Sequence, residues 1–434
     1  MAGAAVQVVH ERCAGLDVHK KTVVACVLVS EATAPDGARA TVRTFGTMTT
    51  DLEQLATSLA ERGVTHVAME ATGAYWKPVY NVLEAHGAFT LLVVNAEHFR
   101  AVPGRKTDVR DAEWLASLLR HGLLRASFIP HREQRELREL TRYRTSLIRE
   151  RASEVNRLQK TLEMANVKLA AVLSDITGAS GQRILQALLD GPEGETDAAA
   201  AAASALAGLA HARVLKTKRA ALEQAVVGRL TPATPALTFI VRRQLAHLAH
   251  LDDLIAECDA EVEAQTRPFV AQLEQLRTIP GVGTRTGEVV LAEVGVDMTR
   301  FPTHRHLAAW AGMCPGNKES GGKRRPAKSR RGSPWLKAAL TEAAWATRRC
   351  KDGYLPAQFR RLAARRGPKR AIVAVGHTIL VIAYHLLRHG SAYADLGGTY
   401  FDQRDRDATC RRAVKRLEAL GYHVHLESAT PTSP

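Results

Sequence analysis

The chain has 434 residues, 46% of them hydrophobic, which is enough for two or three domains that each bury a core. Sixty Lys and Arg against 44 Asp and Glu give a formal net charge of +16, which favours a polyanionic partner, either nucleic acid or a membrane surface. No apolar run approaches the roughly 20 residues that span a bilayer, and no secretory signal opens the chain, so we expect nucleic acid and no membrane. The six cysteines form no CxxC pair, which indicates neither a zinc site nor disulfides and fits a reducing cytoplasm.

Residues 1–128 alternate between short apolar runs and amphipathic segments. The apolar runs predict strands, and the segments between them predict helices at Thr50–Arg62 and Tyr75–His86. This alternation is typical of an α/β domain with a mixed sheet. The predicted strands are Val23–Val29, Ala40–Thr44, His66–Met69 and Thr90–Val94.

A helical region is predicted over 129–275. Residues 131–164 contain no Gly or Pro, and their leucines recur at three, four and seven, which predicts one long amphipathic helix. Its narrow apolar stripe predicts a coiled coil with a second helix near 235–275, and this pair is expected to help form a dimer. A structural arm is the first interpretation, and nucleic-acid contact by its arginines is the second. The Ala-rich segment 165–240 predicts a helical insertion.

Residues 276–390 predict an all-helical, basic domain. Residues 391–434 predict a polar tail with a short helix near Ala413–Leu420 and a loose end. Within the domain, LRTIPGVGTRTGEVVLAEVG places Gly281 and Gly283 between two helical segments, as in a helix-hairpin-helix. Backbone amides at such a turn hold a phosphate without reading the base sequence, although a PGVG turn also serves as a plain connector.

The next stretch is strongly basic. Between positions 318 and 331 it carries seven Lys and Arg and one Glu, a net charge of +6. Its glycines predict a loop, and Pro334 is predicted to begin the following helix. A loop of this charge can bind phosphate without any catalytic residue. The residues expected to contact nucleic acid here are Lys318, Lys323, Arg324, Arg325, Lys328, Arg330 and Arg331.

Four carboxylates stand out in the α/β part. Asp17 lies in GLDVHKKTVVACVLV, an apolar strand in which a lone carboxylate is costly unless it is paired. Glu70 directly follows a strand, and Asp108 and Asp111 lie one turn apart at the start of a helix. Turn capping and the helix dipole would explain these positions without any function. Gathered at one sheet edge, the four would repel each other unless cations intervene, and hard carboxylate oxygens suit Mg²⁺.

Cations surround the last two of these carboxylates. Arg105, Lys106 and Arg110 lie within three residues of Asp108, in a chain with excess positive charge. We expect Lys106 and Arg110 to contact nucleic acid. Mg²⁺ held by carboxylates neutralises the charge on a reacting phosphodiester, so the two features fit one site.

The local sequences of these stretches, and their order along the chain, resemble those of a known family. GLDVHKKTVVACV, MEATGAYW and KTDVRDA, which hold the four carboxylates, are similar to the RuvC-like DEDD domain of IS110-family transposases. AGMCP (311–315) is similar to the segment that precedes a Ser-Gly loop in the C-terminal domain of that family, and Ser320 matches its serine. The resemblance covers residues 10–128 and 270–390.

The resemblance implies an RNase H/RuvC-like α/β domain at 1–128 and a serine-bearing transposase domain at 276–390. It implies a cytoplasmic DNA recombinase of insertion-sequence type, in which Ser320 attacks phosphorus and forms a phosphoserine link to DNA. Strands could then be rejoined without ATP. The catalytic carboxylates and Mg²⁺ ligands would be Asp17, Glu70, Asp108 and Asp111.

The family also implies partners. A structured guide RNA would pair with donor and target DNA, so that base pairing supplies the choice of sequence. A homo-oligomer, a dimer or tetramer, is expected, in which the serine domain acts with the DEDD domain of another protomer.

Two other functions stay open from the residues. In a junction-resolving nuclease the carboxylates alone would activate water, and Ser320 would be a bystander in a DNA-binding loop. In a non-catalytic nucleic-acid scaffold the acidic residues would be helix caps. Ser329 and Ser333 rival Ser320 but match the family's downstream S-x-x-G segment and rank below it. A metal requirement would exclude the scaffold, and a covalent protein–DNA adduct would exclude the nuclease.

Overall fold

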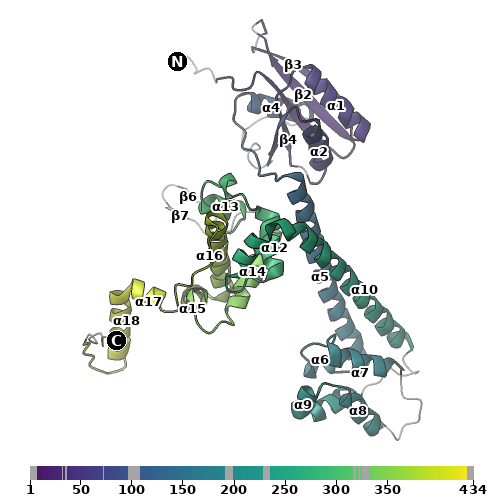
Figure 1. Ribbon diagram of the computed structural model, residues 1–434, viewed down its shortest axis with the longest axis vertical. Helices are drawn as coiled ribbons and strands as arrows, with labels where there is room; N and C mark the ends of the chain where they lie inside the picture. Colours follow the sequence, from purple (N-terminus) through teal and green to yellow (C-terminus); the bar gives the residue numbers. More distant parts are fainter. Residues whose placement is uncertain are drawn as a thin grey trace. The chain divides into compact units, whose positions relative to one another are not determined.

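The computed structural model shows two compact units, residues 1–130 and 131–434, which we describe separately (Figure 1). The structure describes residues 7–31, 33–34, 37–71, 73–95, 108–190, 199–227, 235–315, 319–320, 323–324 and 332–427. At 108–110, 199–200, 319–320 and 323–324 it describes the backbone alone.

The first unit is built on a mixed five-stranded sheet in the order β3-β2-β1-β4-β5. Strands β1 to β3 are antiparallel neighbours, and β1, β4 and β5 run parallel. This arrangement confirms the predicted α/β class with a mixed sheet, and each of the four predicted strands forms. The strands are β1 (Arg12–Val18), β2 (Thr22–Ser30), β3 (Ala38–Gly46), β4 (His66–Glu70) and β5 (Thr90–Val94).

Helices cover both faces of this sheet. Helices α1 (Thr49–Glu61) and α2 (Trp76–His86) pack on one face, where Leu16 meets Leu52 and Leu83 in a shared core. Helix α4 (Asp108–Arg120) packs on the other face, against Cys13, Ala68 and Val94. Successive side chains of a strand point to opposite faces, so the odd-numbered residues of β1 face α4.

The second unit begins with two long antiparallel helices, α5 (Arg132–Met164) and α10 (Pro235–Thr266) (Figure 1). Leucines of α5 pack on Leu251 and Ile255 of α10, so the predicted long helices form and pair within one chain. Whether they interlock as a coiled coil or form a dimer stays a prediction. The segment between them is helical, as predicted, and packs as one core with the ends of α5 and α10. It holds α6 (Leu169–Val172), α7 (Ala179–Asp190), α8 (Ala199–Gly208) and α9 (Ala212–Ala225).

The rest of the unit is almost entirely helical. Helix α16 packs against α11, α13, α14 and α15. The tail helix near Ala413–Leu420 was predicted too short, because α18 starts at Arg406 and follows α17, and the last residues lie outside the described part. The elements are η2 (Arg267–Phe269), α11 (Val270–Arg277), α12 (Thr284–Val294), η3 (Met298–Arg300), α13 (His304–Trp310), β6 (Glu319–Ser320), β7 (Lys323–Arg324), α14 (Pro334–Thr347), α15 (Tyr354–Arg366), α16 (Pro368–His389), α17 (Tyr400–Arg404) and α18 (Arg406–Glu418).

Helix α16 corrects one expectation from the sequence. It has 22 residues, and its most apolar 18-residue stretch has a mean hydropathy of 1.6, so by length and composition it could cross a membrane. No apolar run was expected to approach that length. Half of its most apolar stretch is buried inside the unit. Ile372, Val375, Ile379 and Leu380 are among its buried side chains, so its apolar character serves the core of this unit.

Candidate active site

Asp17 lies near the end of the central strand β1, where the residue is 9% exposed. The strand pairs with β2 and with β4, and helices cover both faces of the sheet here, so burial on two faces explains the apolar run around Asp17. The Asp17 Oδ2 atom lies 3.1 Å from Nε2 of His19, in the turn that leads to β2. The buried Asp17 carboxylate therefore has a histidine beside it. The two are only two residues apart in the sequence, and our prediction did not include His19.

Gly15 explains how α4 reaches this strand. A Cβ atom on Gly15 would lie 2.3 Å from the Ala112 carbonyl oxygen and 2.4 Å from the Ala116 nitrogen, so only glycine lets the helix backbone come this close. At the far end of the helix, the Arg120 carbonyl accepts hydrogen bonds from Val9 and His10, just before β1. The helix thus runs antiparallel to β1, and its first turn lies toward the end that holds Asp17.

Glu70 is the last residue of β4 and not, as predicted, the residue after a strand. Strands β1 and β4 are parallel, with Leu16 paired to Met69, so Asp17 and Glu70 occupy the next positions on neighbouring strands. Backbones of adjacent strands lie about 4.8 Å apart. Glu70 lies two residues after Ala68, which faces α4, so both carboxylates belong to the α4 face.

The two acidic residues of α4 complete the predicted set. Helix α4 starts at Asp108, as predicted, and Asp111 is exposed in its first turn. The side chains of Asp108 and Arg110 lie outside the described part, as does Lys106. Among the described residues no three His, Cys, Asp or Glu side chains are grouped closely enough to hold a metal ion. The fold thus brings Asp17 and Glu70 together and orients the start of α4 toward them.

The donors on this face are oxygens. Burial raises the pKa of Cys13 to about 11 and that of Cys26 to about 12, so both thiols stay protonated at neutral pH. A protonated thiol is a poor metal ligand. The chemistry of this edge therefore suits a hard cation such as Mg²⁺ over a soft one.

In the second unit, Ser320 lies in a short β-hairpin. The stretch 318–331 was predicted to be a loop, but Glu319 pairs with Arg324 and Ser320 with Lys323, so that β6 and β7 are antiparallel. The two residues between the strands, both glycines in the sequence, lie outside the described part. The side chains of Ser320, Lys323 and Arg324 lie outside the described part, as do the residues Lys318, Arg325, Lys328, Ser329, Arg330 and Arg331.

The chain after the hairpin is fixed at its base. A Cβ on Gly332 would lie 2.3 Å from backbone atoms of Ala311 and Gly312, so the two ends of the hairpin segment touch. Ser333 Oγ accepts a hydrogen bond from the Leu336 amide at 3.2 Å and caps α14, which begins at Pro334 as predicted. The same hydroxyl donates to Glu293 Oε2 at 3.0 Å.

Glu293 is the centre of a buried ionic cluster. It is 1% exposed, and Arg142 donates to its two carboxylate oxygens at 2.7 and 3.0 Å. Arg138 donates to the Glu293 backbone carbonyl at 2.6 Å, and burial lowers its pKa to about 10. Helices α5 and α12 are therefore joined to the cap of α14. A glutamate inside the apolar run EVVLAEV was the available signal, and the sequence prediction missed it.

The PGVG turn shows two different glycines. Gly281 has φ +87°, and a Cβ there would lie 2.3 Å from the Ala343 carbonyl oxygen, so packing on α14 explains this residue. Gly283 caps α12 and has no neighbouring atom within 4 Å of such a Cβ, so this end of α12 is open. A helix, a turn and a second helix are present, and the helix-hairpin-helix role stays a prediction.

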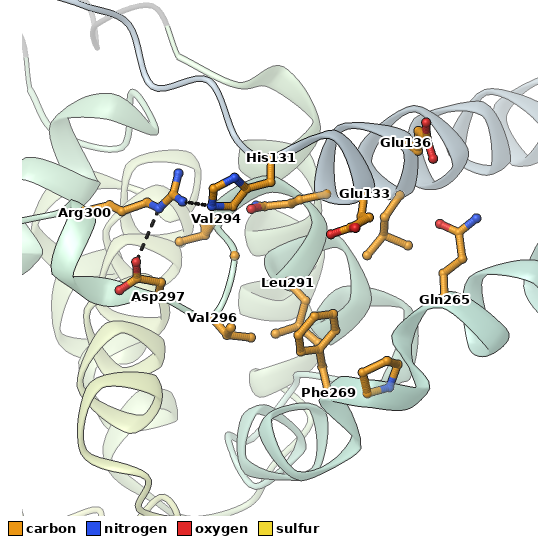
Figure 2. A pocket seen from close by; sticks show the side chains of 14 residues that line it. His131, Glu133, Glu136, Gln265, Phe269, Leu291, Val294, Val296, Asp297 and Arg300 are labelled. Atoms are coloured by element: carbon orange, nitrogen blue, oxygen red, sulfur yellow. Dashed lines mark hydrogen bonds and ion pairs between the residues drawn. The ribbon is translucent and has the colours of Figure 1, made fainter. Parts of the chain in front are cut away.

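One cavity of about 550 Å³ opens where α5, α10 and α12 meet (Figure 2). Leu291, Val294 and Phe269 form its apolar lining. Three carboxylates, of Glu133, Glu136 and Asp297, also line it, against Arg300 and His131, which contact each other. This acidic and apolar lining does not fit a polyanion, and none of the predicted site residues lies in it.

Comparison with known proteins identifies the chain's relatives. A profile of the DEDD transposase domain of IS110 elements, described as a transposase, matches residues 14–166. A second profile, described as the transposase IS116/IS110/IS902 family, matches residues 273–360. Together the two profiles span more than half of the chain, and they include Asp17, Glu70, Asp108, Asp111 and Ser320.

Curated relatives agree with the profiles. A probable family 20 transposase of Pseudomonas aeruginosa is 25% identical over 75% of this chain and 85% of its own length. The transposase for insertion sequence element IS1111A of Coxiella burnetii is 24% identical over 78% of this chain and 82% of its own length. A 43.6 kDa protein of insertion element IS110 from Streptomyces coelicolor is 30% identical over 39% of this chain and 41% of its own length. The chain belongs to the IS110 family of insertion-sequence transposases.

Proposed function

We propose that this transposase is a metal-dependent DNA recombinase that cuts and rejoins strands through a covalent phosphoserine at Ser320. The observation that carries the proposal is the placement of Asp17 and Glu70 on neighbouring parallel strands, on the face covered by α4. The start of α4, with Asp108 and Asp111, lies toward the same end of β1. Four carboxylates at one end of a sheet can hold divalent cations, which are suited to the cleavage of a phosphodiester.

The four carboxylates would hold Mg²⁺ in this proposal. Bound there, the ion would neutralise charge on the scissile phosphodiester. Carboxylate oxygens and protonated cysteines on this face fit a hard cation. His19, 3.1 Å from Asp17, would orient that carboxylate.

The serine supplies the nucleophile. Its Oγ attacks the phosphorus, the bond from phosphorus to the leaving deoxyribose oxygen breaks, and the serine proton passes to solvent or to a nearby base. The product is a phosphodiester between Ser320 and DNA, so a deoxyribose hydroxyl can attack it in the reverse sense and rejoin strands. Cations around the hairpin would hold the DNA backbone, together with the open amide end of α12 at Gly283.

Partners complete the proposal. A structured guide RNA would supply the choice of donor and target sequence, and a dimer or tetramer would bring the two parts of the site together. The net charge of +16 supports the binding of several polyanions at once.

A denaturing gel tests the chemistry. The full chain is incubated with Mg²⁺, RNA transcribed from the flanking sequence of its element, and labelled target DNA, and we expect a band of protein joined to DNA. Ser320→Ala should remove this band, and Asp17→Asn or Glu70→Asn should remove cleavage and leave DNA binding intact. A merely structural serine would leave the band unchanged.

Other outcomes select the alternatives. Cleavage without any adduct, unchanged in Ser320→Ala, would favour a metal-dependent nuclease. Binding without cleavage in the presence of Mg²⁺ or Mn²⁺ would favour a scaffold. An adduct that survives Ser320→Ala and disappears in Ser329→Ala would move the nucleophile to Ser329.

A further inference from the structure

A dense group of cations lies on the second unit, outside the stretches that the proposed chemistry uses. From Arg348 to Arg370 the chain carries nine Lys and Arg and a single carboxylate, that of Asp352. That carboxylate accepts a hydrogen bond from the Gly353 amide at 2.7 Å. Eight of the nine cations are exposed, and Arg361 is half-buried.

These cations have no carboxylate partner among the described residues, because no ion pair within 4.0 Å involves any of them. The arginines of α5 are different: Arg142, Arg144 and Arg151 each pair with Asp or Glu of α10 or α12. Unpaired like charges repel each other and weaken a fold unless a polyanion binds them. The segment therefore has the charge pattern of a phosphate-binding surface.

Aromatic rings hold two of the cations in place. The guanidinium of Arg348 lies 5.0 Å from the ring centre of Trp345 and 5.4 Å from that of Phe359. The guanidinium of Arg361 lies 5.5 Å from the ring centre of Phe401. Stacking on a ring fixes a guanidinium and leaves its donors in the plane free for phosphate oxygens. Of the remaining seven cations, Arg349 and Lys351 lie between α14 and α15. The other five lie on α15 and on the first turn of α16, whose backbone amides also favour an anion.

The position of this surface relates it to the Ser320 hairpin. Gly376 of α16 packs against Met313, two residues before the proline that leads toward the hairpin. Seven residues separate Lys369 from Gly376 along the helix, which is about 10 Å at 1.5 Å per residue. This distance, from Lys369 to the contact with Met313, corresponds to about three base pairs of duplex rise. Ser320 follows Met313 by seven residues in the sequence.

We propose that the exposed cations of α15 and the first turn of α16 bind the phosphate backbone of duplex DNA a few base pairs from the scissile phosphate. We call Arg360, Arg365, Arg366, Lys369 and Arg370 the α15–α16 surface. Its place beside the scissile phosphate rests on the proposed role of Ser320, and its binding of DNA does not. All but Arg360 lie beyond the region that the second family profile matches. The surface reads charge and not sequence, because it offers phosphate contacts alone.

The salt dependence of DNA binding tests this proposal in the full chain. A combined variant carries Arg360→Gln, Arg365→Gln, Arg366→Gln and Arg370→Gln, and its affinity for a labelled duplex of mixed sequence is measured by fluorescence anisotropy at several NaCl concentrations. The slope of log K against log salt should become shallower by about 3 to 4, because each phosphate contact contributes about 0.9. The four corresponding Arg→Lys changes keep the charge and should keep most of the slope.

The matched control removes four charges from another exposed helix. Arg213→Gln, Lys216→Gln, Lys218→Gln and Arg219→Gln on α9 should leave the slope nearly unchanged. An equal loss in the α9 variant, an unchanged slope in the α15–α16 variant, or a loss seen with duplex RNA and not with duplex DNA would overturn the proposal. The denaturing gel tests the serine mechanism, and the salt slope tests DNA binding by the α15–α16 surface. A missing adduct together with the predicted change of slope would therefore overturn the proposed function and leave this proposal standing.

Discussion

At the scale of single residues, Ser333 joins three parts of the second unit. It caps α14, donates to the buried Glu293, and follows Gly332 at the base of the hairpin segment. We expect Ser333→Ala to destabilise the protein by about 1 to 3 kcal/mol, because a cap is lost and a buried carboxylate loses a donor. Thermal unfolding measures this cost. Adduct formation at Ser320 should persist at a reduced rate.

Ser333→Asn is the matched control. Its side-chain oxygen can cap the helix and its amide can donate to Glu293, but it has no hydroxyl. Near-normal stability and adduct formation in this variant would show that Ser333 positions the hairpin. Complete loss of the adduct in a folded Ser333→Asn protein would mean instead that Ser333 is the nucleophile.

Asp17 was predicted from the sequence and Glu293 was missed, because the evidence for Asp17 is local and the partners of Glu293 are distant in the chain. Asp17 was predicted because a charged residue in an apolar strand is unusual within a window of a few residues. Glu293 stood out equally inside EVVLAEV, but its partners Arg138 and Arg142 lie about 150 residues earlier. No local pattern therefore indicates that this carboxylate has hydrogen-bond partners. A buried carboxylate and its partner must be close in space, and nothing requires that they be close in the chain.

At the scale of elements, the seating of α4 on β1 is the feature on which the candidate site depends. Gly15→Ala would place a methyl group 2.3 Å from the Ala112 carbonyl, and backbone there cannot move without shifting the helix. We expect destabilisation by about 2 kcal/mol or more and loss of DNA cleavage, since the first turn of α4 would move relative to Asp17.

Protease resistance of the first unit in increasing urea measures this change. The control is Gly208→Ala in α8, where a methyl group would meet no atom within 4 Å and helix propensity should slightly stabilise the protein. Unchanged resistance and unchanged cleavage in Gly15→Ala would show that the helix does not need this close contact.

For the long helix α5, the hydrophobic periodicity predicted the bounds of the helix but did not decide the role of its arginines. Its bounds were predicted to within one residue because 33 residues without Gly or Pro leave little choice. Its arginines had two interpretations, and the structure favours the structural arm: Arg144, 2% exposed, lies 2.7 Å from Glu288 and 2.9 Å from Asp259. Its apolar stripe packs against α10, the second long helix with which it was predicted to pair.

At the scale of the whole molecule, the residue pattern predicted the fold class of the first unit, and the resemblance predicted the family. The alternation of strands and helices predicted the α/β unit, and motif order predicted the family, which the profiles confirm. The insertion at 165–240 was predicted only as helical, because its alanine tract has no period that distinguishes one face from another. Its core with the ends of α5 and α10 depends on contacts across more than 60 residues.

The whole-molecule expectation that most needs an experiment is that the serine and the carboxylates act from different protomers. Asp17→Asn and Ser320→Ala are each expected to be inactive alone. In a mixed dimer, one composite site would combine the intact carboxylates of the Ser320→Ala chain with the intact serine of the Asp17→Asn chain. Random mixing makes half of the dimers mixed, each with one working site of two, so roughly a quarter of the wild-type adduct should return.

The two variants are co-expressed so that chains exchange during assembly, and adduct is counted on a denaturing gel. The adduct should be attached to the Asp17→Asn chain, which a size tag on one chain identifies. A double variant carrying both changes, mixed with either single variant, offers no chain pair with both working parts and should stay inactive. If the co-expressed single variants also stay inactive while light scattering shows that mixed dimers form, each protomer must use its own serine with its own carboxylates.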